Sequence, residues 1–138
     1  MTDADAPTGF ARAPFSPGFL DHGGPYFLKA REGAPQIVGL RIMEHHINFK
    51  DGAHGGVIST FADVALSHAV YDAERPRLAP STITLSVNYL AAAKLGDWLE
   101  ARVQIDKMGG RTAYTSGEIT RDGEPVATMT GVFSIRRD

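Results

Sequence analysis

The spacing of apolar residues predicts one long helix in the middle of the chain. Over residues 57–73 apolar side chains recur at intervals of three and four, the period of a helix with one broad apolar face. The pair Arg75-Pro76 marks its far end. So wide a face favours burial on more than one side, and a second subunit could cover one of them. The apolar positions are Val57, Ile58, Phe61, Ala62, Ala65, Leu66, Ala69 and Val70.

After Pro80 the apolar period changes to two, which predicts strands. Residues 81–90 alternate apolar and polar side chains, with Ile83 to Tyr89 expected to face the core, and the same alternation returns over 99–105, 113–119 and 127–135. The sequences KLGD, KMGGR and RDGEP separate these strands, and their glycines suit tight reversals. We therefore expect neighbouring strands to pair antiparallel. The Ile- and Val-rich stretch 36–49 predicts one further strand.

The order of strand, helix and four strands predicts an α+β fold. We expect a curved antiparallel sheet of about five strands wrapped around the one long helix. Residues 1–35 are rich in proline and glycine near their start and predict an irregular arm with one or two short helical turns around residues 19–28. Residues 36–138 would then form the body of a single domain.

Composition narrows the classes of function. The 138 residues are 43% hydrophobic and 22% charged, as in one globular domain, and the absence of cysteine excludes disulfides and thiol chemistry. A net charge of −2 supplies no basic field for nucleic acid. No strongly apolar run reaches the ~20 residues that span a bilayer, and the acidic start MTDADAP is unlike a secretory signal. We expect a cytoplasmic protein without a nucleic-acid or membrane partner.

The segment 48–63, NFKDGAHGGVISTFAD, holds the residues most suited to chemistry. His54, Gly55 and Gly56 precede the predicted helix, where unpaired backbone N–H groups and the helix dipole favour an anion or an oxyanion. The alternative is that the two glycines only form a loop. Asp63 lies within the helix among apolar neighbours, which indicates either a functional carboxylate or a residue on a solvent-facing polar stripe with Ser59 and Ser67.

The separation of Gly55 from Asp63 bears on the number of subunits. Eight residues of helix place them about 12 Å apart along the axis, so both cannot contact one reacting carbon. A carbonyl polarised by the Gly55 N–H and attacked by a carboxylate must find its aspartate on a second copy of the helix. A site of this design implies a dimer.

Other polar residues carry weaker signals. Asn48 could orient water or a carbonyl, or simply end a strand before a turn. His45 and His46 are metal-ligand types, but as neighbours on a regular strand they would point to opposite faces, so we expect no metal. His68 has no nucleophile arrangement beside it and suits a helix surface or an interface.

Three cations lie at or beside the predicted reversals. Lys94, Lys107 and Arg111 could meet the phosphates of a ligand there, although most cations at turns are only solvated.

Three segments together resemble the hotdog-fold acyl-CoA thioesterases, specifically the PaaI-type branch related to phenylacetate metabolism. They read NFKDGAHGGVISTFADVALSHA, STITLSVNYLAAAKLGD and KMGGRTAYTSGEITRDGEPVATMTGVFS, and the resemblance spans roughly residues 36–135. Its most specific parts are Asn48, the His54-Gly55-Gly56 turn and the spacing to Asp63. The resemblance implies a sheet wrapped around the helix, with two protomers joining their sheets to build sites between them. It also implies tetramers as a common assembly.

The resemblance further implies roles for individual residues. The Gly55 N–H would polarise the thioester carbonyl, Asn48 would help to place the carbonyl or the water, and Asp63 of the partner subunit would act as nucleophile or general base. A hydroxyl that assists the water would be Thr82, with Ser81 adjacent. The residues bordering the acyl-CoA would be His54, Gly56, Tyr89, Leu90, Lys94, Lys107 and Arg111, the last standing one place along from the cation of some relatives.

The expected function is hydrolysis of a small or medium aryl- or fatty-acyl-CoA to the free acid and CoA, without a cofactor. The arm before residue 36 would help to shape the acyl pocket, together with side chains such as Phe19, Phe27, Phe61 and Leu66. Two alternatives remain open. One is an acyl-CoA binding module without turnover, and the other is a hotdog enoyl-CoA hydratase or dehydratase that uses His54.

Overall fold

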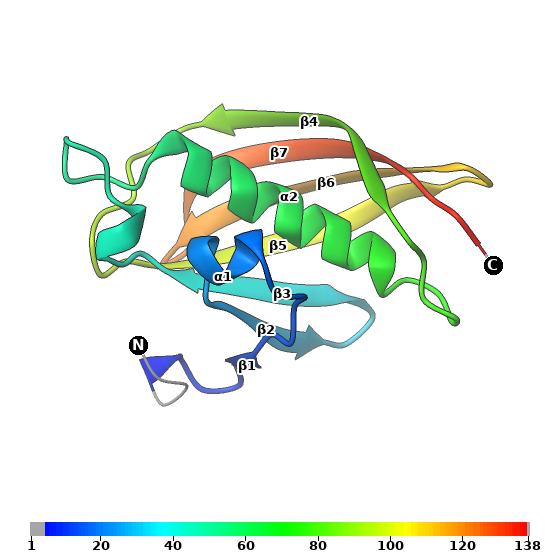
Figure 1. The fold of residues 1–138 in the computed structure, drawn as a ribbon, viewed down its shortest axis with the longest axis horizontal. Coiled ribbons are helices and arrows are strands. Elements are labelled where there is room, and N and C mark those ends of the chain that lie inside the picture. Colours follow the sequence, from blue (N-terminus) through cyan, green and yellow to red (C-terminus); the bar gives the residue numbers. More distant parts are fainter. Residues whose placement is uncertain (1–4, 138) are drawn as a thin grey trace.

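The computed structural model describes residues 5–137, which form one antiparallel sheet with a long helix lying across it (Figure 1). The seven strands stand in the order β1-β2-β3-β5-β6-β7-β4, and the helix α2 covers one face of the sheet. The predicted α+β wrap around one central helix is confirmed, with seven strands where about five were expected. The elements are β1 (Ala11–Arg12), α1 (Phe19–Gly23), β2 (Tyr26–Arg31), β3 (Ala34–Arg41), the 3-10 turn η2 (Glu44–His46), α2 (Gly55–Tyr71), β4 (Ser81–Tyr89), β5 (Trp98–Met108), β6 (Thr112–Arg121) and β7 (Glu124–Ser134).

Helix α2 is held against the sheet by the apolar face that its period predicts. Phe61, Ala62 and Leu66 have no exposed surface. Gly131 lies under the helix, where a Cβ atom would stand only 3.0 Å from Leu66 Cδ1. Glycine at this position of β7 therefore lets the helix approach the sheet closely.

The pairing of β4 differs from the prediction. The hairpins β5–β6 and β6–β7 form as expected, but β4 pairs with β7 at the edge of the sheet, and β5 pairs with β3 in its interior. The glycine of KLGD does not close a hairpin: Gly96, with φ 90°, donates its N–H to Ile42 O beyond the end of β3. Residues 90–97 instead carry the chain from the edge of the sheet to its middle.

The first third of the chain contains more regular structure than expected. The short helix α1 agrees with the predicted turns, but Tyr26–Arg31 is a strand that pairs with β3 across the turn at Gly33, whose φ is 70°. Strand β3 ends at Arg41, so the prediction of a strand over the whole of 36–49 is wrong. His45 and His46 lie in η2 rather than on a strand, with ring centroids 3.9 Å apart.

Strand β4 leaves a long apolar edge uncovered. We expected Ile83, Leu85, Val87 and Tyr89 to face the core. Leu85 and Val87 are partly buried against it, but Ile83 is 57% exposed and Tyr89 54%, and no residue of β4 is fully buried. Figure 1 shows β4 as the outermost strand beside β7. Edge strands of this length and composition are templates for pairing with another chain.

Among residues 5–137 no helix combines the length and the hydropathy needed to cross a bilayer.

Candidate active site

The first turn of α2 presents one free backbone amide. His54 caps the helix: its Nδ1 accepts a 2.8 Å hydrogen bond from the Gly56 N–H, and its carbonyl accepts from the N–H groups of Val57 and Ile58. The Gly55 N–H has no acceptor among residues 5–137. Of the four N–H groups that a helix leaves unpaired at its start, Gly55 therefore supplies the one that can meet a ligand. The cap occupies Nδ1 of His54 and the N–H of Gly56, two residues predicted to contact substrate.

The loop before α2 is held by backbone hydrogen bonds. The His54 N–H donates to His46 O (2.8 Å), and the Ala53 N–H donates to Ala93 O (2.7 Å). Asn48 closes the loop with its Oδ1, which accepts from the Lys50 N–H at 2.9 Å. The Asn48 side-chain oxygen therefore stabilises a turn. This is the structural role that we considered for Asn48 as the alternative to orienting water or a carbonyl.

Three predicted ligand-binding residues lie at this same end of α2. The Tyr89 hydroxyl donates to Gly55 O at 3.1 Å and also contacts Ser59 Oγ, so it steadies the first turn of the helix. Leu90 follows it and is 56% exposed. Lys94 is exposed and forms a β-bridge with Gly52 in the loop before the helix. Leu90 and Lys94 therefore follow Tyr89 in the segment that adjoins the first turn of α2 and the loop before it.

Asp63 and Thr82 meet in the middle of α2. The Thr82 hydroxyl donates a 2.7 Å hydrogen bond to Asp63 Oδ1. Regular alternation would turn Thr82 away from the helix together with Thr84. A bulge at Ile83 reverses this, because Thr82 is opposite the core-facing Phe133 whereas Thr84 is opposite the next residue, Val132. Bulges at sheet edges commonly re-aim side chains in this way.

The remaining predicted residues lie at the Thr82 end of β4. Ser81 is opposite Ser134, and the Ile135 N–H donates to Arg111 O at 2.9 Å, which places Arg111 beside the start of β4. Lys107 is opposite the exposed Tyr114, on the face of the sheet away from α2. Within one chain, Lys107 and Arg111 therefore do not converge with Lys94.

A cavity of about 700 Å³ opens beside Asp63 along the outer flank of α2. Asp63, Ser67 and Tyr71, spaced by four, share this flank with Val64 and His68, and the arm contributes Pro14, Phe15 and Ser16. Leu20 of α1, Leu28 of β2 and Gln36 of β3 complete its inner wall. Phe27, Phe61 and Leu66, expected to shape a pocket, are fully buried, and Phe19 is 70% exposed; none of the four lines this cavity.

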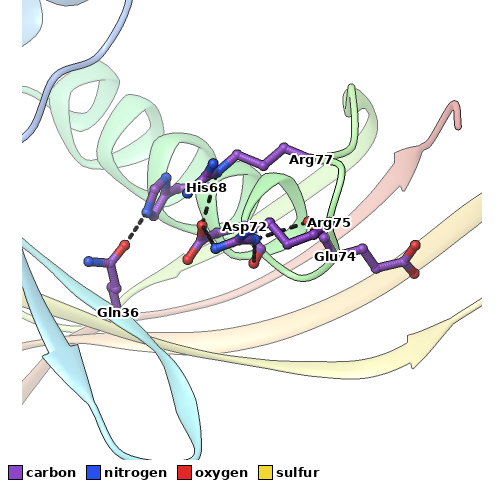
Figure 2. Close-up of polar contacts among 6 residues, drawn as sticks. All are labelled: Gln36, His68, Asp72, Glu74, Arg75 and Arg77. Atoms are coloured by element: carbon purple, nitrogen blue, oxygen red, sulfur yellow. Dashed lines mark hydrogen bonds and ion pairs between the residues drawn. The ribbon is translucent and has the colours of Figure 1, made fainter. Parts of the chain in front are cut away.

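His68 and Gln36 form a polar pair in the wall of this cavity that the sequence did not predict. Figure 2 shows them pointing toward one another from α2 and β3. His68 Nε2 lies 2.8 Å from Gln36 Oε1, and burial lowers the pKa of His68, the nearby Asp72 carboxylate opposing this and Arg77 reinforcing it. The imidazole is therefore neutral at pH 7. In the sequence, this side of the cavity is indicated by the spacing of four residues from Asp63 through Ser67 to Tyr71, with His68 next to Ser67.

His45 and His46 have structural partners in the backbone. Burial lowers the pKa of His46, whose Nδ1 accepts from the Met43 N–H (2.9 Å) while Nε2 donates to Gly23 O (2.7 Å). His45 Nε2 lies 2.8 Å from Gly24 O. Among the described residues, no three His, Asp or Glu side chains stand in an arrangement that could hold a metal ion.

Comparison with known proteins places this geometry in context. The family model described as thioesterase superfamily matches residues 51–128. A candidate esterase of Pseudomonas aeruginosa is 36% identical over 131 residues, which cover 95% of this chain and 98% of that protein. A hypothetical thioesterase of Streptococcus pneumoniae, solved with coenzyme A, superposes with a TM-score of 0.73 at 25% identity, covering 80% of this chain and 87% of that one.

A third comparison concerns the fold alone. The PaaI protein of the Escherichia coli phenylacetic acid degradation operon has a TM-score of 0.68 at 23% identity, over 74% of this chain and 72% of that one. Together with the family match, these likenesses confirm the hotdog fold.

Proposed function

This chain belongs to the thioesterase superfamily and is a thioester hydrolase, and we propose that it cleaves a small or medium aryl- or fatty-acyl-CoA to the free acid and CoA. The observation that carries the proposal is the contact between Thr82 and Asp63 on the helix whose first residue offers a free amide. The presence of coenzyme A in the Streptococcus pneumoniae structure supports CoA as the leaving group.

The proposed site combines two copies of the chain. Gly55 and Asp63 are separated by about 12 Å of helix, so the amide of one protomer works with Asp63 of the partner subunit. The uncovered edge of β4 supports a homodimer in which two such edges pair antiparallel. This pairing sets the Tyr89 end of one β4 strand beside the Ser81 end of the other. Association of two dimers into a tetramer remains a prediction, as does a cytoplasmic location.

The chemistry follows from these positions. The Gly55 N–H donates to the thioester oxygen and stabilises the negative charge that develops there. The carboxylate of the partner subunit's Asp63 then either attacks the carbonyl carbon or takes a proton from a water molecule that attacks it. Thr82 holds one carboxylate oxygen and leaves the other free. The carbon–sulfur bond breaks, and the CoA thiolate leaves and takes up a proton. If the carboxylate attacks, this step leaves a mixed anhydride on Asp63, which water then hydrolyses to the free acid and the restored carboxylate. If water attacks, the free acid forms directly.

The CoA moiety would lie across the same seam. Tyr89 contacts Gly55, and Leu90 and Lys94 follow it in the same chain. Lys107 and Arg111 lie toward the Ser81 end of β4. Antiparallel pairing of two β4 edges would bring these groups of cations toward one ligand, where they can neutralise its phosphates. His54 caps α2, so the hydratase alternative gains no support from the structure.

The test is release of free thiol from a panel of aryl-acetyl, hydroxybenzoyl and C4–C16 acyl-CoAs. The Asp63→Asn variant should lose about 100-fold or more in kcat, because it removes the acid–base group. Binding of the panel without thiol release would support the binding-module alternative. Full activity of Asp63→Asn would rule out the proposed mechanism.

A further inference from the structure

Among residues 5–137, the large apolar side chain with the greatest exposure is Phe49, at 91%. It belongs to the loop before α2, an ordered turn in which the Asn48 N–H donates to Gly52 O (2.8 Å) and the Asp51 N–H donates to Asn48 O (3.2 Å). This turn therefore holds an aromatic ring in water. Single exposed apolar side chains are common on protein surfaces, so the surroundings of Phe49 decide what its exposure means.

The surroundings of Phe49 adjoin the uncovered edge of β4. The loop 48–53 lies beside the segment that follows β4, because Gly52 forms a β-bridge with Lys94. Further apolar side chains, each more than half exposed, follow one another along β4 and into this segment: Ile83, Tyr89, Leu90 and Leu95. The exposed ring of Phe49 therefore extends the same edge that the proposed dimer covers, which favours a second copy of this chain as its cover.

The far end of the cavity beside Asp63 is bounded by a second exposed aromatic ring. Tyr71 ends α2, is 43% exposed and lines the cavity together with Arg77 and Pro80. It follows Asp63 by eight residues, or about 12 Å along the helix axis. An acyl group bound at Asp63 therefore reaches Tyr71 only if its chain is long.

Antiparallel pairing of two β4 edges joins these two regions. Figure 1 shows the loop before α2 and the segment between α2 and β4 at opposite ends of the molecule. The helix rises about 24 Å from Gly55 to Tyr71, and the nine residues of β4 span about 26 Å. When the Tyr89 end of one strand lies beside the Ser81 end of the other, the loop of one protomer comes to the Tyr71 end of its partner. Two-fold symmetry repeats this contact at both ends of the seam.

We propose that Phe49 of each protomer packs against the partner subunit's Tyr71 and closes the far end of the partner's cavity. Phe49 is then a specificity residue for long apolar acyl chains. Its ring excludes water from the last methylene groups of a chain that reaches Tyr71, and a shorter chain gains nothing from it. The inference rests on the proposed function, because it takes the β4 seam as the dimer interface and this cavity as the acyl site.

A disulfide tests the contact between subunits. The chain contains no cysteine, so a pair introduced at Phe49 and Tyr71 has no competing thiol. Within one chain the two positions lie at opposite ends of a helix about 24 Å long, beyond the roughly 7 Å between Cα atoms that a disulfide can span. After mild oxidation, the double variant Phe49→Cys/Tyr71→Cys should run as a covalent dimer on a non-reducing gel.

The controls for this disulfide use the same chemistry at other positions. Each single variant should run as a monomer, because two-fold symmetry sets the two Phe49 residues at opposite ends of the seam. Phe49→Cys combined with Tyr114→Cys, on the face of the sheet away from α2, should also give no covalent dimer. Absence of the covalent dimer in the Phe49→Cys/Tyr71→Cys variant, or its equal formation in the controls, would overturn the inference.

Acyl chains of different length test the selection. Phe49→Ala should lower kcat/KM for decanoyl-CoA about 15-fold, because about two methylene groups return to water at about fourfold each. The same variant should keep butanoyl-CoA within about twofold of wild type, since this chain ends before Tyr71. Phe49→Leu keeps an apolar cover and should retain most of the activity toward decanoyl-CoA. Tyr114→Ala removes an exposed ring away from the seam and should leave both substrates unaffected.

Three results with these substrates would contradict the selection. One is an equal loss for the two substrates in Phe49→Ala, and another is no loss for decanoyl-CoA. The third is a wild-type protein that cleaves butanoyl-CoA but not decanoyl-CoA.

A binding measurement distinguishes failure of this inference from failure of the proposed function. Dissociation constants of decanoyl-CoA and butanoyl-CoA are compared between Asp63→Asn and the double variant Asp63→Asn/Phe49→Ala, which report selection without turnover. If the wild-type protein releases no thiol, but the disulfide forms and loss of Phe49 weakens only decanoyl-CoA about 15-fold, the hydrolytic function fails and the inference stands. Thiol release without the disulfide and with equal effects on both ligands would have the opposite meaning.

Discussion

The first turn of α2 and its middle carry the two halves of the proposed site, and they are built differently. The amide half is backbone: a free Gly55 N–H, held in place by a histidine cap and by hydrogen bonds from a contiguous loop. The carboxylate half is made of side chains, Asp63 and Thr82, which come from a helix and an edge strand 19 residues apart in sequence. The amide half should therefore tolerate many side-chain changes but lose activity when the Gly55 N–H is removed. The carboxylate half should lose activity when a single functional group, the Asp63 carboxylate or the Thr82 hydroxyl, is removed.

The largest expected effect removes the amide and leaves the helix. Gly55 is the first helical residue, where proline is tolerated, and His54, with φ −58° and ψ 141°, already has the conformation that a following proline requires. Gly55→Pro should fold and lose about 10²–10³-fold in kcat, the usual result of deleting one oxyanion donor.

The control for this variant is Gly55→Ala. An alanine Cβ would lie 3.8 Å from the Tyr89 ring, an ordinary contact, and the N–H remains. Steady-state thiol release should therefore be close to wild type for Gly55→Ala. Comparable activity of the proline and alanine variants would show that the amide half plays no part in the reaction.

A mixed dimer tests whether the halves come from different chains. A heterodimer purified through two different tags, one chain carrying Gly55→Pro and the other Asp63→Asn, holds one intact site if the halves combine between subunits. It should recover about half of the wild-type activity, although each parent homodimer is nearly inactive. Activity no higher than that of the parents, or a monomer in light scattering, would contradict a shared site.

A smaller effect is expected from the hydroxyl of the carboxylate half. Thr82→Val keeps the shape of the side chain and removes the hydrogen bond to Asp63, which should lower kcat roughly tenfold. Thr82→Ser should retain most activity. Thr84→Val, the same change two residues along on the opposite face of the strand, serves as the control, and an equal loss there would deny Thr82 a specific role.

The smallest expected effect concerns stability, and it reaches both halves. Burial lowers the pKa of His46, behind the amide half, and of His68, beside the carboxylate half. Below about pH 6.5 the unfolded chain takes up protons before the folded one does, so stability falls as the pH drops toward the folded pKa values. The loss is about 1.4 kcal/mol for each unit by which a pKa is lowered.

Urea unfolding at pH 7.5 and pH 5.5 measures this loss. The His68→Phe variant should show a weaker dependence on pH than the wild-type protein, because one of the two histidines no longer titrates. A free energy of unfolding that does not change between the two pH values would contradict burial of both histidines as neutral groups.

Much of the amide half could be predicted from the sequence. The glycine pair before a run of helical period indicates an exposed helix start, and the count from Gly55 to Asp63 gives their separation directly. The carboxylate half could be predicted only in part. Alternation alone assigns Thr82 to the same face as Thr84, and the bulge at Ile83 that reverses this assignment has no local signature.

The helix, the strands with a clear period of two, and the distance between the two reactive groups can all be derived from the sequence alone. These depend on the 3.6- and 2-residue periods of the backbone, which neighbouring residues express. Three other features follow from folding in three dimensions: β4 lies at the edge of the sheet, Thr82 turns toward Asp63, and His68 meets Gln36 across a cavity. Each of these depends on pairing or packing between residues far apart in the chain, and no local pattern contains that information.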